Sequence, residues 1–158
     1  MEIYCYPRSR EEKGLTPFGN NQAAIDASSA IIAVIGDAEA YKNAQEIYAQ
    51  NVELGYMDQS IAETYATNTY NSYSKLPQQV LSQFASYDAG LISMQILLLA
   101  KDRGYDTLVM GGFDKVDFAK RFELPENQFP IALIALGKAK TPAFNSSRLP
   151  LEKIVTFY

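Results

Sequence analysis

Short runs of β-branched and apolar residues mark the strands that the chain is expected to form. SAIIAVI at 29–35 is apolar from its second residue on and ends at Gly36, which is typical of a buried central strand. IALIAL at 131–136 predicts a second buried strand, and TLVM at 107–110 predicts a short one. IVTFY at 154–158 predicts a terminal strand. Because no neighbouring segment can pair with it, we expect it to pair with a partner subunit.

Two helices are predicted between the first two of these strands. Asp37 is suited to cap a helix over about 38–50, and Asp58 begins a second helix that contains IAETYATNTY. Six of the eleven tyrosines fall between positions 41 and 73. At such spacing tyrosines usually pack against each other, and a second interpretation is that they line a ligand pocket.

The longest predicted helix covers about 77–103. Pro77 suits the first helical position, and Gly104 follows the last one. The second half, AGLISMQILLLA, is apolar on every face. A helix of this kind is expected to be fully buried, either in the core or between two subunits.

Two adjacent glycines, Gly111 and Gly112, separate the short strand from a further helix. Asp114 is placed to cap that helix, with Phe113 and Phe118 at the two ends of a hydrophobic staple. One interpretation of the glycines is a plain turn that needs a positive φ. The other is that a flat or bulky ligand approaches the backbone closely there.

The order of these elements predicts a single α+β domain over residues 1–158. The strands are few and are separated by helices without a regular βαβ rhythm. We therefore expect a small mixed, mainly antiparallel sheet wrapped by helices. A chain of 158 residues with 47% apolar residues is long enough to bury its own core.

Charge and composition exclude several partners. The net charge is −4 and the basic residues are dispersed, which argues against a nucleic-acid partner. The longest apolar run is far short of the roughly 20 residues that span a bilayer, and the N-terminal residues lack the apolar segment of a signal peptide. A single cysteine, Cys5, fits a reducing compartment, so a cytoplasmic protein with no membrane partner is expected.

The residues that the chain lacks narrow the chemistry further. The sequence contains no histidine, which excludes the usual Ser–His and Cys–His nucleophile pairs and argues against a zinc site. Neither of the common glycine-rich nucleotide-binding motifs occurs. If the protein is an enzyme, we expect its reactive group to be a bound cofactor, with no catalytic side chain and no metal.

Two loops carry candidate binding residues. In NSSRLP at 145–150, Ser146 and Arg148 are suitable donors for a phosphate group, although an exposed arginine in a loop is often only solvated. In FGNNQ at 18–22, the amide of Asn20 can match the polar edge of a heterocycle, although such a pair of asparagines often only forms a turn.

Taken together, these motifs resemble the nitroreductase family of flavin enzymes over about residues 15–158. The resemblance lies in FGNNQAAIDASSAIIAVIGD, in YDAGLISMQILLLAKDRGYDT, in the GGFD turn and in SSRLPLEKIVTFY, in that order. It implies a homodimer with FMN in a cleft between the subunits. It further implies that Met110, Gly111 and Gly112 lie against the isoalloxazine, that Asn20 contacts its polar edge, and that Arg148 holds the phosphate.

The chain departs from the pattern of this family at three places. Ser146 stands where some members have a basic residue, and Ala23 stands where some have a lysine near the flavin. The family begins with an Arg-x-Ser-x-Arg helix, but MEIYC lies where an edge strand is expected. Arg8 and Arg10 are then expected in a solvated loop, and the domain is expected to be N-terminally short.

The activity implied by the resemblance is transfer of a hydride from NAD(P)H through FMN to a nitroaromatic, quinone or similar acceptor. One cleft used in turn by both substrates implies ping-pong kinetics. Tyr65, Tyr70 and Tyr73 are candidates for lining the acceptor pocket. Two alternatives stay open: a non-enzymatic dimerising remnant that has lost its flavin, and an FMN enzyme with other chemistry, such as dehydrogenation of a bound substrate. The sequence leaves the acceptor and the choice between NADH and NADPH open.

Overall fold

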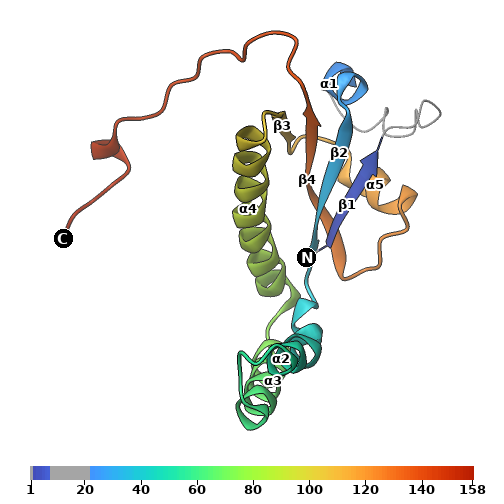
Figure 1. Ribbon diagram of the computed structural model, residues 1–158, viewed down its shortest axis with the longest axis vertical. Helices are drawn as coiled ribbons and strands as arrows, with labels where there is room; N and C mark the ends of the chain where they lie inside the picture. The colour runs from blue at the N-terminus through green and yellow to red at the C-terminus, as the bar shows by residue number, and fades with distance from the viewer. Residues whose placement is uncertain (1, 8–21) are drawn as a thin grey trace.

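The computed structural model describes residues 2–7 and 22–158 of the chain. Figure 1 shows a narrow sheet with helices on both faces and a helical hairpin beyond one end. The elements in chain order are β1 (Glu2–Pro7), α1 (Gln22–Ala27), β2 (Ala30–Asp37), η2 (Ala40–Asn43), α2 (Ala44–Glu53), α3 (Gln59–Tyr73), α4 (Gln78–Asp102), β3 (Asp106–Met110), α5 (Lys115–Arg121), β4 (Gln128–Gly137) and η3 (Leu151–Lys153).

The described strands form one four-stranded sheet in the order β1-β2-β4-β3. The two apolar runs, β2 and β4, lie at the centre, and the shorter strands β1 and β3 form the edges. Every pair among the described strands is antiparallel, so the predicted mixed sheet is wholly antiparallel there. The predicted α+β fold is confirmed, as is the expected N-terminal edge strand.

The two faces of the sheet bury different helices. Ile31, Ala33 and Ile35 of β2 belong to a core cluster with α1 and α5, whereas Val34 packs against α4. This alternation is the two-residue period of a strand that is covered on both faces. Figure 1 shows α4 on one side of the sheet and α5 on the other.

The long helix confirms both of its predicted ends. Pro77 is the N-cap residue of α4, and Gly104, which follows the helix end, has φ 74°. The burial of α4 differs from the expectation, because the described residues cover one face of the helix and leave the other exposed. Ala89 is fully buried, whereas Leu91 and Leu98 are 57% and 64% exposed. Full burial in the core of this chain is therefore wrong, and burial between subunits stays a prediction.

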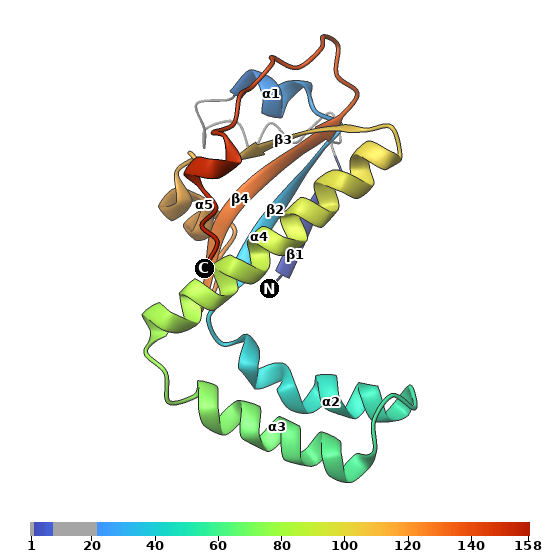
Figure 2. The ribbon, with the colours of Figure 1, turned by 90° about the vertical axis from the view of Figure 1, so that its left-hand side faces the viewer.

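The tyrosine-rich region forms the helical hairpin, which projects beyond the sheet (Figure 2). Its helices α2 and α3 pack against each other, and each has one buried residue, Ala44 in α2 and Ala62 in α3. Tyrosine rings pack edge to face across the pair, with centroids 5.8 Å apart for Tyr48 of α2 and Tyr65 of α3, and Tyr41 of η2 packs in the same way on Tyr70. This is the packing role expected for tyrosines at helical spacing.

A hydrogen-bonded carboxylate holds the base of this hairpin. Asp37, the last residue of β2, accepts from the N–H of Glu39 at 2.8 Å. The same oxygen, Oδ1, accepts from Nδ2 of Asn127 at 2.7 Å. The helix predicted over about 38–50 with Asp37 as its cap is wrong in its bounds, because a short 3-10 helix, η2, precedes α2 and Glu39 is the N-cap residue of η2. The predicted start of the second helix is confirmed, because Asp58 is the N-cap residue of α3.

Residues 138–158, here called the C-terminal arm, leave β4 and extend away from the sheet (Figure 1). Every residue of the arm is exposed, and Phe144 reaches 102% exposure. The strand expected at 154–158 is wrong for the single chain: η3 ends at Lys153, and the residues after it form no strand. A strand requires a neighbouring strand to pair with, and residues 154–158 have none among the described residues.

Candidate functional site

The glycine turn joins the edge strand β3 to helix α5. The predicted cap is confirmed, because Oδ1 of Asp114 accepts from the N–H of Asp117 at 2.8 Å. The predicted staple is confirmed too, with the rings of Phe113 and Phe118 5.6 Å apart. The turn is thus fixed from the α5 side by a cap and an aromatic contact.

Neither glycine of this turn is required by the chain's own geometry. Among the described glycines only Gly55 and Gly104 have a positive φ, so the interpretation as a turn needing a positive φ is wrong. A Cβ added to Gly111 or Gly112 would meet nothing within 4 Å. At Gly36, by contrast, it would lie 2.6 Å from the ring of Phe129. The open space beside both glycines therefore faces outward.

Met110 contributes its side chain to the core and only its backbone to the turn. Its side chain is 4% exposed and belongs to the cluster that contains Phe118 and Leu133. Any contact of Met110 with a ligand beside the turn therefore has to be made by the backbone.

Ser146 and Arg148 lie together on the C-terminal arm. Nη1 of Arg148 donates to the hydroxyl oxygen of Ser146 at 3.1 Å and to the carbonyl oxygen of Ser147 at 2.9 Å. Both side chains are exposed. A guanidinium beside a hydroxyl is a donor set that suits a phosphate group.

Within one chain the structure does not bring these two groups of residues together. The hydrogen bonds made by residues 140–158 in the described part of the chain stay within that stretch. Asn20, Arg8 and Arg10 lie outside the described residues, and Ala23 is exposed on α1.

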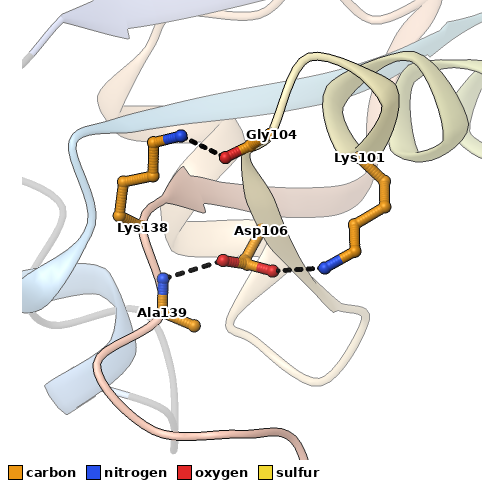
Figure 3. Close-up of polar contacts among 5 residues, drawn as sticks. All are labelled: Lys101, Gly104, Asp106, Lys138 and Ala139. Atoms are coloured by element: carbon orange, nitrogen blue, oxygen red, sulfur yellow. Dashed lines mark hydrogen bonds and ion pairs between the residues drawn. The ribbon is translucent and has the colours of Figure 1, made fainter.

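A cluster that the sequence did not indicate holds the root of the arm (Figure 3). The Asp106 carboxylate accepts from the N–H of Ala139 at 2.9 Å and from Nζ of Lys101 at 2.9 Å. Lys138 donates to the carbonyl oxygen of Gly104. The Ala139 N–H, followed by the Lys101 ammonium, holds the pKa of Asp106 below its ordinary value.

Only one half of this cluster left a signal in the sequence. Lys101 and Asp106 have opposite charges and lie only five residues apart across the end of the long helix, so the sequence can suggest that they pair. Ala139 lies 33 residues from Asp106 and contributes a backbone amide, which no side-chain pattern reveals.

The described residues contain neither a buried charge nor a metal cluster. No polar or charged residue among them is buried, and no three histidine, cysteine, aspartate or glutamate side chains gather where they could hold a metal ion. In the same part of the chain, no helix combines the length and apolar character needed to cross a membrane.

Comparison with known sequences gives a consistent match. The model of the Nitroreductase family matches residues 6–138. YodC of Bacillus subtilis (strain 168), assigned as an NAD(P)H nitroreductase, is 39% identical over 143 residues, which cover 90% of this chain and 70% of YodC. YdgI of the same organism carries the same assignment and is 38% identical over 150 residues, covering 94% of this chain and 71% of YdgI.

Solved structures match over nearly the whole chain. A protein of Exiguobacterium sibiricum, assigned as a nitroreductase and solved in complex with FMN, superimposes with a TM-score of 0.93 at 31% identity. The match covers 99% of this chain and 76% of that one. A protein of Staphylococcus epidermidis, assigned as an NAD(P)H:FMN oxidoreductase, gives a TM-score of 0.94 at 30% identity, over 99% of this chain and 75% of the other.

Proposed function

The chain belongs to the nitroreductase family, and from this membership we propose that it is an FMN-dependent oxidoreductase. It takes a hydride from NAD(P)H and passes reducing equivalents to a nitroaromatic, quinone or similar small acceptor. The solved relative that binds FMN and the relatives assigned as NAD(P)H nitroreductases support this proposal.

The observation that carries the proposal is the unexplained pair of glycines. Gly111 and Gly112 are exposed, lack positive φ and have open space where a Cβ would stand. Glycine in a position that neither conformation nor internal packing demands fits a surface that a flat ring must approach. The isoalloxazine of FMN is such a ring.

Each proposed residue has a limited role. The backbone of Met110, Gly111 and Gly112 would lie against the ring, and Ser146 and Arg148 would donate hydrogen bonds to the phosphate. Asn20 is proposed to contact the polar edge of the ring. When bound, FMN supplies the hydride chemistry, so the protein's contribution is to hold and orient it and to shape the cleft for the acceptor.

We further propose that the working form is a homodimer. The chain exposes 11692 Å², against about 7,900 Å² expected for a compact monomer of this mass. Much of the apolar part of this surface lies in two places, a stripe along α4 and the C-terminal arm. The α4 stripe follows the alternating spacing of three and four residues that packs one helix against another, and it contains Phe84, Tyr87, Leu91, Met94 and Leu98.

Dimerisation also accounts for the separation of the proposed binding residues. Arg148 is carried on an arm that leaves its own sheet, so in a dimer it can reach the glycine turn of the partner subunit. A cleft between subunits then combines the turn of one chain with the arm of the other.

The proposal is tested by flavin content and kinetics. The purified protein should be yellow or bind added FMN, and it should oxidise NADH or NADPH with a quinone as acceptor. If both substrates use one cleft in turn, double-reciprocal plots at several acceptor concentrations should be parallel, and intersecting lines would contradict the ping-pong scheme. A colourless protein that binds no FMN would contradict the proposal and favour the non-enzymatic dimerising alternative.

A further inference from the structure

We propose that Asp106 is a positioning residue for the FMN phosphate, acting through the C-terminal arm. By holding the root of the arm, it sets where Ser146 and Arg148 lie. This inference rests on the proposed function, because it assumes that these two residues bind the phosphate.

The contacts at the root fix both the place and the direction in which the arm leaves the sheet. Asp106 pairs with Gly137 in the β3–β4 ladder, so Ala139 lies two residues beyond the last paired position. There the carboxylate replaces the missing strand partner, because its Oδ2 accepts the N–H of Ala139 while Oδ1 accepts from Lys101. The single side chain of Asp106 thus ties the arm to the end of α4.

Lys138 adds a second tie to the same turn. Its ammonium donates to the carbonyl oxygen of Gly104 and lies 4.6 Å from the centroid of the Tyr105 ring. Two successive residues of the arm are therefore fastened to the α4–β3 connection (Figure 3).

Beyond Ala139 the described chain gives the arm no further hold on its own subunit. Residues 140–158 are exposed and form hydrogen bonds only among themselves. Arg148 comes nine residues after Ala139, a distance of up to roughly 30 Å in extended chain. A change of direction at the root is therefore amplified at Arg148: a 10° rotation moves the end of such a segment by roughly 5 Å.

A double-mutant cycle in FMN affinity tests this coupling. Asp106→Ala should weaken FMN by roughly 3- to 10-fold, the effect of losing one or two modest hydrogen bonds, and Arg148→Ala by about 10- to 100-fold. If Asp106 acts through Arg148, the double variant should bind FMN no more weakly than Arg148→Ala alone. Riboflavin, which lacks the phosphate, should bind equally well to all four proteins.

The matched control is Asp102→Ala, which removes the same charge four residues earlier. Asp102 is the exposed last residue of α4 and makes none of the contacts at the root. Its replacement should leave the affinity for FMN unchanged. If Asp106→Ala folds poorly by circular dichroism, Asp106→Asn serves in its place, because the amide keeps one acceptor oxygen and loses the other.

The outcomes separate this inference from the proposed function. Independent, multiplying effects of the two substitutions, or an equal loss of riboflavin and FMN affinity in Asp106→Ala, would overturn the positioning role. The positioning role would also be overturned if Asp106→Ala left the affinity for FMN unchanged while Arg148→Ala still weakened it. In that case the proposed phosphate site would stand. If Arg148→Ala itself has no effect, the phosphate assignment fails and the inference fails with it.

Discussion

At the scale of single residues, the conformation of the glycine turn excludes the two usual reasons for a glycine. Glycine usually marks a positive φ or a close contact, and Gly104 and Gly36 illustrate these two cases in this chain. Gly111 and Gly112 illustrate neither. A side chain can be added at either position without disturbing the fold. Substitutions there are therefore good probes of a ligand.

Gly112→Ala and Gly112→Val should leave the free energy of unfolding of the apoprotein within about 0.5 kcal/mol of the wild type, because the position is exposed and open. FMN affinity should fall with side-chain size, and Val should abolish it by occupying the face of the ring. Flavin titration and thermal unfolding measure the two effects. Retention of yellow colour in Gly112→Val would return the turn to a purely structural role.

The lowered pKa of Asp106 predicts how the stability of the protein depends on pH. Its pKa is depressed in the folded protein by the Ala139 N–H and by Lys101, so the stability it contributes is present above the unfolded pKa. That contribution is lost as the pH falls through the lower, folded pKa. The difference in Tm between wild type and Asp106→Asn should therefore be present at neutral pH and shrink below about pH 4. A difference that stays constant from pH 7 to pH 3 would contradict this.

At the scale of elements, α4 is the helix whose surroundings matter most. One face packs against β2 and β4 through Ala89, Ile96 and Leu97, while the opposite stripe stays exposed. A helix with apolar residues all round is stable in water only when both faces are covered. Its exposed stripe is therefore the part of the proposed dimer interface that one substitution can test.

Leu98→Glu should raise the dimer dissociation constant at least about 10-fold, because it places a charge in each subunit where the proposed interface would bury a leucine. Analytical ultracentrifugation at micromolar concentration measures the change. Val116→Glu is the control, since Val116 is 81% exposed on α5, a different helix. A dimer equally stable in all three proteins would show that the α4 stripe is not the interface.

At the scale of the whole molecule, the arm makes the protein extended. An exposed segment with Leu149, Ile154 and Phe157 is costly in water and gains stability by covering another surface. Removal of residues 154–158 should weaken the dimer, whereas thermal unfolding of the isolated monomer should change little because these residues bury nothing within their own chain. An unchanged dimer dissociation constant would show that the end of the arm does not cross to the partner.

Most of the secondary structure follows from the sequence because its signals are local. Caps such as Asp58 and Asp114, the stop at Gly104 and the apolar runs of β2 and β4 act over a few residues, and each lies where the sequence predicts it. The failure at 154–158 has the opposite cause. Its apolar, β-branched pattern favours pairing, but a strand forms only beside another strand, and the described residues offer it no such partner.

For the candidate site too, some features follow from the sequence and others only from the tertiary structure. The sequence alone determined which residue types are suited to a flat ring and a phosphate, because donor chemistry and the lack of a side chain belong to each residue by itself. Only the tertiary structure decided that the glycines lack positive φ, that Met110 points its side chain into the core, and that Ala139 meets Asp106. Those facts depend on the path of the backbone between residues far apart in sequence, and that path is set by the packing of the whole sheet and its helices.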